Sequence, residues 1–204
     1  MPTLSESDLA ALLAPYLPAA PASLYAQLSI YLDLLLKWNA RTNLTAIRDP
    51  EEIVRRHFGE SLFAAQHLDP KTPTLLDLGS GAGFPGLPIA LLYPEIHVTL
   101  AESQNKKATF LREVVRTLHL DIEVWANRAE SLPPARQFHT VTLRAVDNMA
   151  VALAAAEPRA THQLLLMTSL TSAATAPALP DFPNQTQVPI PESAGRILLL
   201  AARS

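Results

Sequence analysis

Asp77-Leu-Gly-Ser-Gly-Ala-Gly-Phe-Pro-Gly86 holds four of the 6 glycines found among 204 residues. The apolar run at 73–78 predicts a buried strand, and Leu87–Tyr93 predicts a helix after the glycines. Glycine permits a positive φ and a close approach of the backbone to a ligand. The stretch therefore predicts the first βα unit of a nucleotide-binding sheet. A turn that only tightens a βα corner is the alternative, and three alternating glycines argue against it.

The spacing of the glycines bears on the identity of the ligand. A dinucleotide fingerprint, Gly-x-Gly-x-x-Gly, would need its third glycine at position 84, which is Phe84. Instead, Gly79, Gly81 and Gly83 alternate, and Asp77 precedes them by two positions. This pattern is similar to the S-adenosylmethionine loop of class I methyltransferases. We expect the acid to pair with the ligand's ammonium group and the loop N–H groups to bind its carboxylate.

A second acidic residue supports a nucleoside cofactor. The run Ile96–Ala101 predicts the next strand, which ends at Glu102, 23 positions after Gly79. An acid about 20 positions after the loop is placed to accept hydrogen bonds from ribose hydroxyls. The alternative is a charge that favours the start of the following helix.

The remaining chain alternates between predicted helices and strands. Helices are predicted at 4–14, 23–40, from Pro50 through Leu62, at 104–119 and at 146–157, and further strands at 121–125, 139–143, 163–167 and 196–202. Residues 168–191 are rich in Pro, Ala, Thr and Ser and predict a loop. This order predicts an α/β fold with a doubly wound, mainly parallel sheet. We expect an N-terminal helical extension at 1–72 and a compact cofactor-binding domain at 73–204.

Composition excludes several classes of protein. The chain has no cysteine, so disulfides, thiolate zinc sites and a cysteine nucleophile are excluded. Its 6 histidines show no ligand spacing, so no metal site is expected. Export signals and membrane-spanning runs are not recognisable, which predicts a cytoplasmic protein without a membrane partner. The net charge of −3 argues against a strongly basic nucleic-acid binder but allows a local basic face.

Further motifs extend the similarity in register along the chain. They are Asn43–Ile47, Arg56-His57, Ser61-Leu62, the loop with its Phe-Pro-Gly ending, Glu102-Ser, Lys106-Lys107, Phe110-Leu111, Arg128-Ala-Glu130 and Arg144-Ala145. Together they resemble the ribosomal RNA small subunit methyltransferase G family, also called the glucose-inhibited division protein B family. The resemblance covers about residues 24–150.

The resemblance implies N-terminal helices on a class I methyltransferase fold. It implies methyl transfer from S-adenosylmethionine to N7 of a guanine in bacterial 16S rRNA. Because the chain is acidic overall, we expect the 30S subunit or a late precursor, rather than naked rRNA, to be the substrate, and we expect the protein to be a monomer. It implies cofactor contacts at Gly79, Phe84, Ala129, Glu130 and Arg144, and also at Glu102. The chain departs from the family pattern at Glu60, where Asp is usual, and after Met167, where Lys-Gly and a long helix are usual.

Guanine N7 carries a lone pair and no proton, so the reaction needs no general base. Catalysis then reduces to proximity and alignment. Arg144 follows a predicted strand and is the candidate catalytic residue, holding the target guanine or its phosphate. An ion pair with a carboxylate such as Asp147 is the alternative. Other cations that could meet RNA are Arg41, Arg48, Arg55, Arg56, Lys106, Lys107 and Arg128, although Arg55 and Arg56 also fit a solvated helix face.

Two other functions stay open at this point. The chain could methylate a protein or small molecule, although it lacks the Asn-Pro-Pro-Tyr type of motif used for exocyclic amines. It could also be a ligand-binding or ribosome-associated protein without catalysis, given its altered C-terminal third. Cofactor titration followed by methyl transfer to 30S subunits separates these functions.

Overall fold

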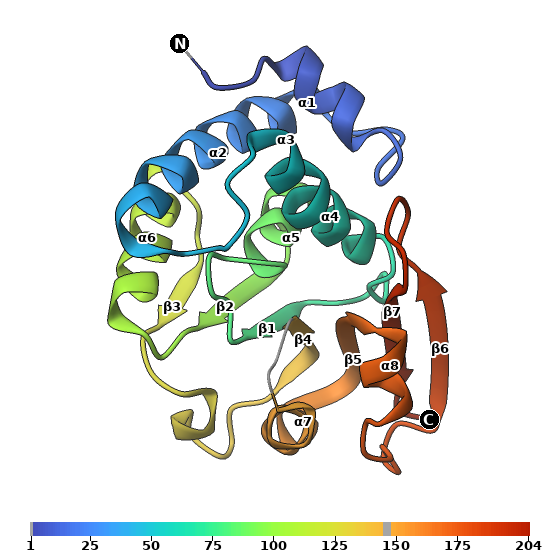
Figure 1. Ribbon diagram of the computed structural model, residues 1–204. Helices are drawn as coiled ribbons and strands as arrows, with labels where there is room; N and C mark the ends of the chain where they lie inside the picture. Colours follow the sequence, from blue (N-terminus) through green and yellow to red (C-terminus); the bar gives the residue numbers. More distant parts are fainter. Residues whose placement is uncertain (1, 145–147) are drawn as a thin grey trace.

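The computed structural model describes residues 2–144 and 148–204 and is built on a seven-stranded sheet of order β3-β2-β1-β4-β5-β7-β6 (Figure 1). The strands are β1 Thr74–Leu78, β2 His97–Ala101, β3 Glu123–Trp125, β4 Phe138–Arg144, β5 Ala160–Ser169, β6 Asn184–Pro189 and β7 Arg196–Ala202. β1 to β5 pair in parallel, whereas β7 is antiparallel to both β5 and β6. The predicted doubly wound, mainly parallel sheet is confirmed. Its strand order reverses between β1 and β4, where open α/β sheets bind ligands.

One face of the sheet is covered by the helices at the top of Figure 1. They are α1 Glu6–Leu13, α2 Ala22–Thr42, α4 Glu60–Ala65, α5 Gly86–Leu92 and α6 Asn105–Thr117. Their apolar stripes form one core with alternate strand residues such as Leu75. The next residue, Leu76, packs into the core on the opposite face, because successive side chains of a strand point to opposite sides. The helices predicted at 4–14, 23–40 and 104–119 are therefore present.

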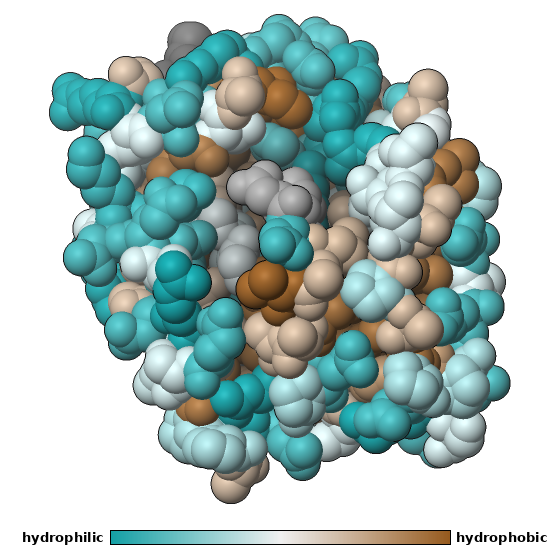
Figure 2. All heavy atoms as spheres, turned by 60° about the horizontal axis from the view of Figure 1, so that its bottom comes forward, coloured by the Kyte–Doolittle hydropathy of each residue, from teal (hydrophilic) through white to brown (hydrophobic). Residues whose placement is uncertain are grey.

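The opposite face has a thinner cover. It consists of α7 Met149–Ala156, the short helix η2 Ala129–Ser131 and the segment 176–182, whose Phe182 is fully buried. In Figure 2 most of the outer part of the visible face is hydrophilic, and apolar side chains gather near its middle. α7 lies at the bottom of Figure 1, the side that Figure 2 brings forward, and its Val151 is 57% exposed.

Local sequence explains how the N-terminal helices begin. Ser5 caps α1 in a capping box with Asp8, and Asp49 caps α3 Pro50–Ile53, which has Pro50 in its first turn. α3 continues through the π-helical segment η1 Val54–Gly59 into α4. Sequence periodicity does not predict this π-helical segment. Such segments add a residue to a turn and occur often at functional sites.

The prediction of one loop over 168–191 is wrong. This stretch contains α8 Leu170–Ala174, capped by Ser169, and the edge strand β6. Proline is tolerated at the end of an edge strand, which is where Pro189 lies. The helix predicted at 146–157 is present as α7, and its expected start lies outside the described residues. No helix in the described part of the chain has the length and apolarity to cross a membrane.

Candidate active site

A cavity of about 360 Å³ opens where β1 and β4 end. It is the candidate active site and is called the carboxyl-edge cavity below. Residues from six parts of the chain line it: Leu44, Thr45, Ala46 and Ile47 before α3, His57 in η1, the loop residues Gly79, Ser80, Gly81, Ala82 and Phe84, and the cations Lys107 in α6, Arg144 in β4 and Arg196 in β7. The cavity therefore joins the glycine loop to an arginine-rich wall.

The three alternating glycines have positive φ angles, but they serve two different purposes. A Cβ atom on Gly79 would meet nothing within 4 Å, and one on Gly81 would meet only a carbonyl oxygen at 3.9 Å. A Cβ atom on Gly83 would lie 2.3 Å from Leu87 Cδ1 and 2.5 Å from the Tyr31 hydroxyl oxygen. Gly83 is therefore required by packing, whereas Gly79 and Gly81 leave open space in front of the loop for a ligand.

Asp77 is fully buried beneath the loop. Its Oδ1 accepts a hydrogen bond from Thr142 Oγ1 at 2.8 Å, and its Oδ2 accepts one from the Gly86 N–H at 3.0 Å. Burial raises the pKa of the Asp77 carboxyl to about 6, although these hydrogen bonds oppose the rise. The side chain thus fastens β4 and the start of α5 to the loop. Its direct contact with a ligand ammonium stays a prediction.

Glu102 lies at the end of β2, as expected, and its carboxylate reaches the loop. Oε2 accepts a hydrogen bond from the Gly81 N–H at 2.9 Å, and Oε1 accepts one from the Gln104 N–H at 2.7 Å. Glu102 is buried and does not line the cavity, and its contact with a ribose stays a prediction. Ala129 and Glu130 form part of η2 after β3, where Ala129 is buried and Glu130 is exposed. Neither lines the cavity, and their cofactor contacts stay predictions.

Arg144 and His57 form a polar pair in the wall of the cavity. Arg144 Nη2 lies 2.8 Å from His57 Nδ1 and donates to the Arg56 carbonyl at 2.6 Å. Because Arg144 donates to Nδ1, the proton of a neutral His57 is on Nε2, which lies 2.7 Å from Thr45 Oγ1. Burial lowers the pKa of His57 to about 2, and Arg144 adds to this effect. The alternative partner Asp147 lies outside the described residues.

Phe84 provides an aromatic floor between these groups. Its ring stacks on His57 with centroids 4.8 Å apart and on Tyr31 with centroids 5.4 Å apart. The Arg144 guanidinium carbon lies 5.6 Å from the centroid of the same ring. The Tyr31 hydroxyl donates a hydrogen bond to the Ala82 carbonyl. Phe84 and Tyr31 thus tie the glycine loop to α2 and η1.

Glu60 is fully buried and lies among three arginines. Its carboxylate oxygens are 2.7 Å from Arg196 Nη2, 3.3 Å from Arg56 Nε and 3.5 Å from Arg144 Nη2. Burial raises the pKa of the Glu60 carboxyl, and the three guanidinium groups oppose that rise. We call Glu60 with these three residues the arginine cluster. One buried anion thereby holds cations from η1, β4 and β7 at one wall.

Of the other cations that could meet RNA, Lys107 lines the carboxyl-edge cavity, and Arg48, Arg55, Lys106 and Arg128 do not. Lys106 and Arg128 are exposed. Arg55 is 40% exposed and pairs with Glu51 at 3.2 Å, as expected for a solvated helix face. Arg48 donates to the Asn39 carbonyl and to Asn43 Oδ1, which fixes the connector before α3.

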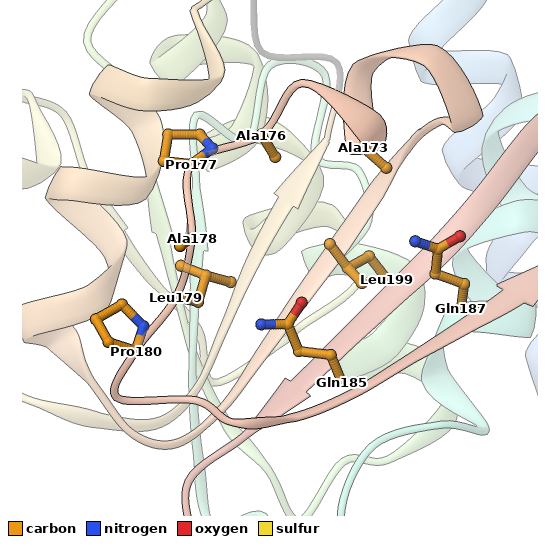
Figure 3. Close-up of a pocket in the computed structure, with 9 residues that line it drawn as sticks. All are labelled: Ala173, Ala176, Pro177, Ala178, Leu179, Pro180, Gln185, Gln187 and Leu199. Atoms are coloured by element: carbon orange, nitrogen blue, oxygen red, sulfur yellow. The ribbon is translucent and has the colours of Figure 1, made fainter.

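A second cavity of about 350 Å³ lies between the segment 173–180 and the last two strands (Figure 3). It is lined by Ala173, Ala176, Pro177, Ala178, Leu179, Pro180, Gln185, Gln187 and Leu199. In Figure 3, Gln185 and Gln187 present the only amides on this wall, beside small apolar side chains. None of these lining residues is titratable, so this cavity offers no acid, base or cation for chemistry.

The family model for GidB, rRNA small subunit methyltransferase G, matches residues 24–180. The chain belongs to this family. It is 45% identical over 139 residues to the ribosomal RNA small subunit methyltransferase G of Chloroflexus aggregans, a match that covers 66% of this chain and 58% of that relative. The Xylella fastidiosa (strain M23) protein of the same name is 49% identical over 120 residues, covering 58% of this chain and 56% of that protein. The chain thus matches less than two thirds of the length of these curated relatives.

Solved structures agree on the fold. A predicted O-methyltransferase from Agrobacterium tumefaciens superimposes with a TM-score of 0.60 at 23% identity, covering 71% of this chain and 80% of that one. The M. jannaschii protein TYW2, in complex with AdoMet, gives a TM-score of 0.55 at 10% identity, covering 72% of this chain and 74% of that one. These likenesses confirm the class I methyltransferase fold predicted from the glycine loop.

Sequence reasoning missed part of the site. It noted Glu60 only as a departure from a motif and gave Arg196 no role beyond the closing strand. The signals available were charged residues inside apolar stretches, Glu60 before Leu62-Phe63 and Arg196 before Ile197-Leu198. Buried charges are rare unless they are paired, so such residues point to one another.

Proposed function

We propose that this protein uses S-adenosylmethionine to methylate N7 of a guanine in 16S rRNA. The observation that carries the proposal is the open space in front of Gly79 and Gly81, at the switch point of a class I methyltransferase sheet. The family and the named relatives support the RNA substrate. The proposed substrate also assigns the protein to the cytoplasm, and 1–72 and 73–204 are proposed to act together as a monomer.

The residues around the cavity fit this cofactor. Main-chain groups of Gly79 and Gly81, which line the cavity, are proposed to meet its amino acid part, and Phe84 to supply an apolar surface. Glu102, which holds the Gly81 N–H, is proposed to accept hydrogen bonds from the ribose. Ala129 and Glu130, after β3, are proposed to meet the adenine. Asp77 supports the loop from below. When bound, S-adenosylmethionine supplies an electrophilic methyl group.

Arg144 is proposed to hold the target guanine. All the hydrogen bonds that the Arg144 side chain makes with described residues come from Nη2. The N–H groups of Nε and Nη1 have no acceptor among those residues and could donate to a substrate. A guanine presents O6 and N7 as neighbouring acceptors. Because N7 must keep its lone pair for the methyl group, Arg144 would donate to O6. Alignment of this kind accounts for about 7–11 kcal/mol of a barrier in favourable cases.

Charge around the cavity suits RNA despite the overall net charge of −3. Lys107, Arg144 and Arg196 all line it, and the buried Glu60 carboxylate offsets only part of that positive charge. A small basic patch gives modest affinity for naked RNA. We therefore propose that the 30S subunit, or a late precursor, presents the guanine in a shape that the protein recognises.

A pair of matched glycine variants tests the cofactor site. Gly81 and Gly195 have similar φ angles of +60° and +70°, and both face open space. Gly81→Ala and Gly195→Ala should therefore cost similar backbone strain, about 1 kcal/mol. Calorimetry should show weakened S-adenosylmethionine binding for Gly81→Ala only. Equal cofactor affinities of the two folded variants would contradict the assignment.

A further inference from the structure

Three potential metal ligands meet at the amino edge of the sheet, opposite the carboxyl-edge cavity. Asp69 lies in the turn before β1, His139 is the second residue of β4 and His162 is the third residue of β5. One ligand atom of each lies within 4.8 Å of the others. The three residues are far apart in the sequence, so their spacing does not predict that they meet. The absence of a metal site expected from the sequence is therefore revised by this group.

Two of the three side chains, Asp69 and His139, are oriented by hydrogen bonds on the side away from the group. Asp69 Oδ1 accepts from the Lys71 N–H at 2.7 Å, which leaves Oδ2 facing His162 Nε2 at 3.2 Å. His139 Nδ1 lies 3.2 Å from Thr140 Oγ1 and 3.4 Å from Thr72 Oγ1, which leaves its Nε2 for another partner. Histidines that bind metals commonly use their second nitrogen in this way.

We propose that Asp69, His139 and His162 bind a divalent transition metal ion, with Zn²⁺ as the best-suited occupant. Two imidazoles and a carboxylate are ligands that Zn²⁺ prefers, whereas Mg²⁺ and Ca²⁺ prefer oxygen alone. Tetrahedral Zn²⁺ places its ligand atoms about 3.4 Å apart, as follows from bonds of about 2.0–2.1 Å. The group must therefore contract slightly. His162 and Asp69, whose side chains are 40% and 30% exposed, can do so, and water can complete the coordination.

The position of this group separates it from methyl transfer. His139 and Arg144 lie near opposite ends of β4, about 16 Å apart at 3.3 Å per residue. An ion at the amino edge would instead join the turn after α4 to β4 and β5. It would thereby fasten the N-terminal helices to the sheet and stabilise the fold by mass action.

The test uses the full chain after treatment with a chelator, titrated with ZnCl₂ in a calorimeter. The variants are His139→Ala, His162→Ala and, as matched control, His97→Ala, which removes an exposed histidine at the start of β2. We expect saturable, equimolar binding by the wild type and by His97→Ala. Each ligand variant should bind at least about 10-fold more weakly. Absence of saturable wild-type binding, or equal binding by His97→Ala and His162→Ala, would overturn the proposal and leave an ordinary contact between His162 and Asp69.

Thermal unfolding gives a second readout. Zn²⁺ should raise the Tm of the wild type and of His97→Ala but not that of Asp69→Asn, which keeps the side-chain shape and serves if an alanine variant does not fold. Co²⁺ bound to the wild type should give visible absorption typical of four or five ligands. Equal Zn²⁺-induced shifts in the wild type and in Asp69→Asn would contradict the site.

Discussion

Replacement of Glu60 by Gln removes the anion of the arginine cluster while keeping its shape. Glu60 is fully buried, so no water replaces its charge toward Arg144, Arg196 and Arg56. Removal of one partner from a buried ion pair typically costs about 3–5 kcal/mol. Arg56 and Arg196 are 38% and 23% exposed and can be hydrated when the anion is lost. We therefore expect the lower end, about 3 kcal/mol of unfolding free energy.

Glu60→Asp is the matched control. It keeps the carboxylate and removes one methylene, which should cost about 1 kcal/mol. Aspartate is also the residue usual at this position in the family that the sequence resembles, so the fold should accept it.

Urea denaturation followed by circular dichroism measures both variants. With a slope of about 3 kcal/mol per molar urea, Glu60→Gln should lower the unfolding midpoint by about 1 M, and Glu60→Asp by about 0.3 M. In a protein that already carries Arg196→Gln, the substitution Glu60→Gln should lower the unfolding free energy by less than it does in the wild type. The reason is that one fewer arginine loses its counter-charge. Equal midpoints for Glu60→Gln and Glu60→Asp would refute the idea that the charge of Glu60 holds the arginines.

Three further predictions concern the same cavity. Arg144→Ala should abolish methyl transfer while the circular dichroism spectrum stays that of a folded protein; transfer within a factor of about ten of the wild type would reject its role. Lys107→Ala should reduce the log–log salt dependence of RNA binding by about 0.7–0.9, and Lys106→Ala, outside the cavity, should not. Burial keeps the pKa of His57 near 2, so below pH 6.5 this histidine binds a proton in the unfolded chain but not in the folded protein. Between pH 7 and pH 5 the free energy of unfolding of the wild type should therefore fall by about 2 kcal/mol because of His57, and His57→Gln should lack this contribution. Urea denaturation at the two pH values measures both proteins. Equal falls in the two proteins would show that folded His57 takes up its proton at an ordinary pH.

Local patterns predicted most of what depends on neighbouring residues. The glycine cluster, the capped start at Asp49 and the closing strand 196–202 all appear where the sequence predicts them. Residues 168–191 were misjudged because composition hides an edge strand that needs only backbone pairing to β7, and its exposed side chains give little hydrophobic signal.

Features that depend on convergence in space could not be predicted from sequence. Glu60 and Arg196 form an ion pair although they are far apart in the sequence. The local sequence around each residue does not indicate which buried charge it pairs with. The role of Asp77 shows the same limit, because the sequence placed its carboxylate at the strand end but could not show that Thr142 and Gly86 occupy both oxygens. The group of Asp69, His139 and His162 exists only once β4 and β5 lie side by side.

Methyl transfer to ribosomal RNA tests the central claim most directly. Purified protein is incubated with labelled S-adenosylmethionine and either 30S subunits or deproteinised 16S rRNA from cells that lack the modification, and the nucleosides are then separated. We predict label in N7-methylguanosine from 16S rRNA, more from assembled subunits than from naked RNA, and none with Arg144→Ala. Label in another nucleoside or in protein, or no label with a protein that binds the cofactor, would contradict the proposed function.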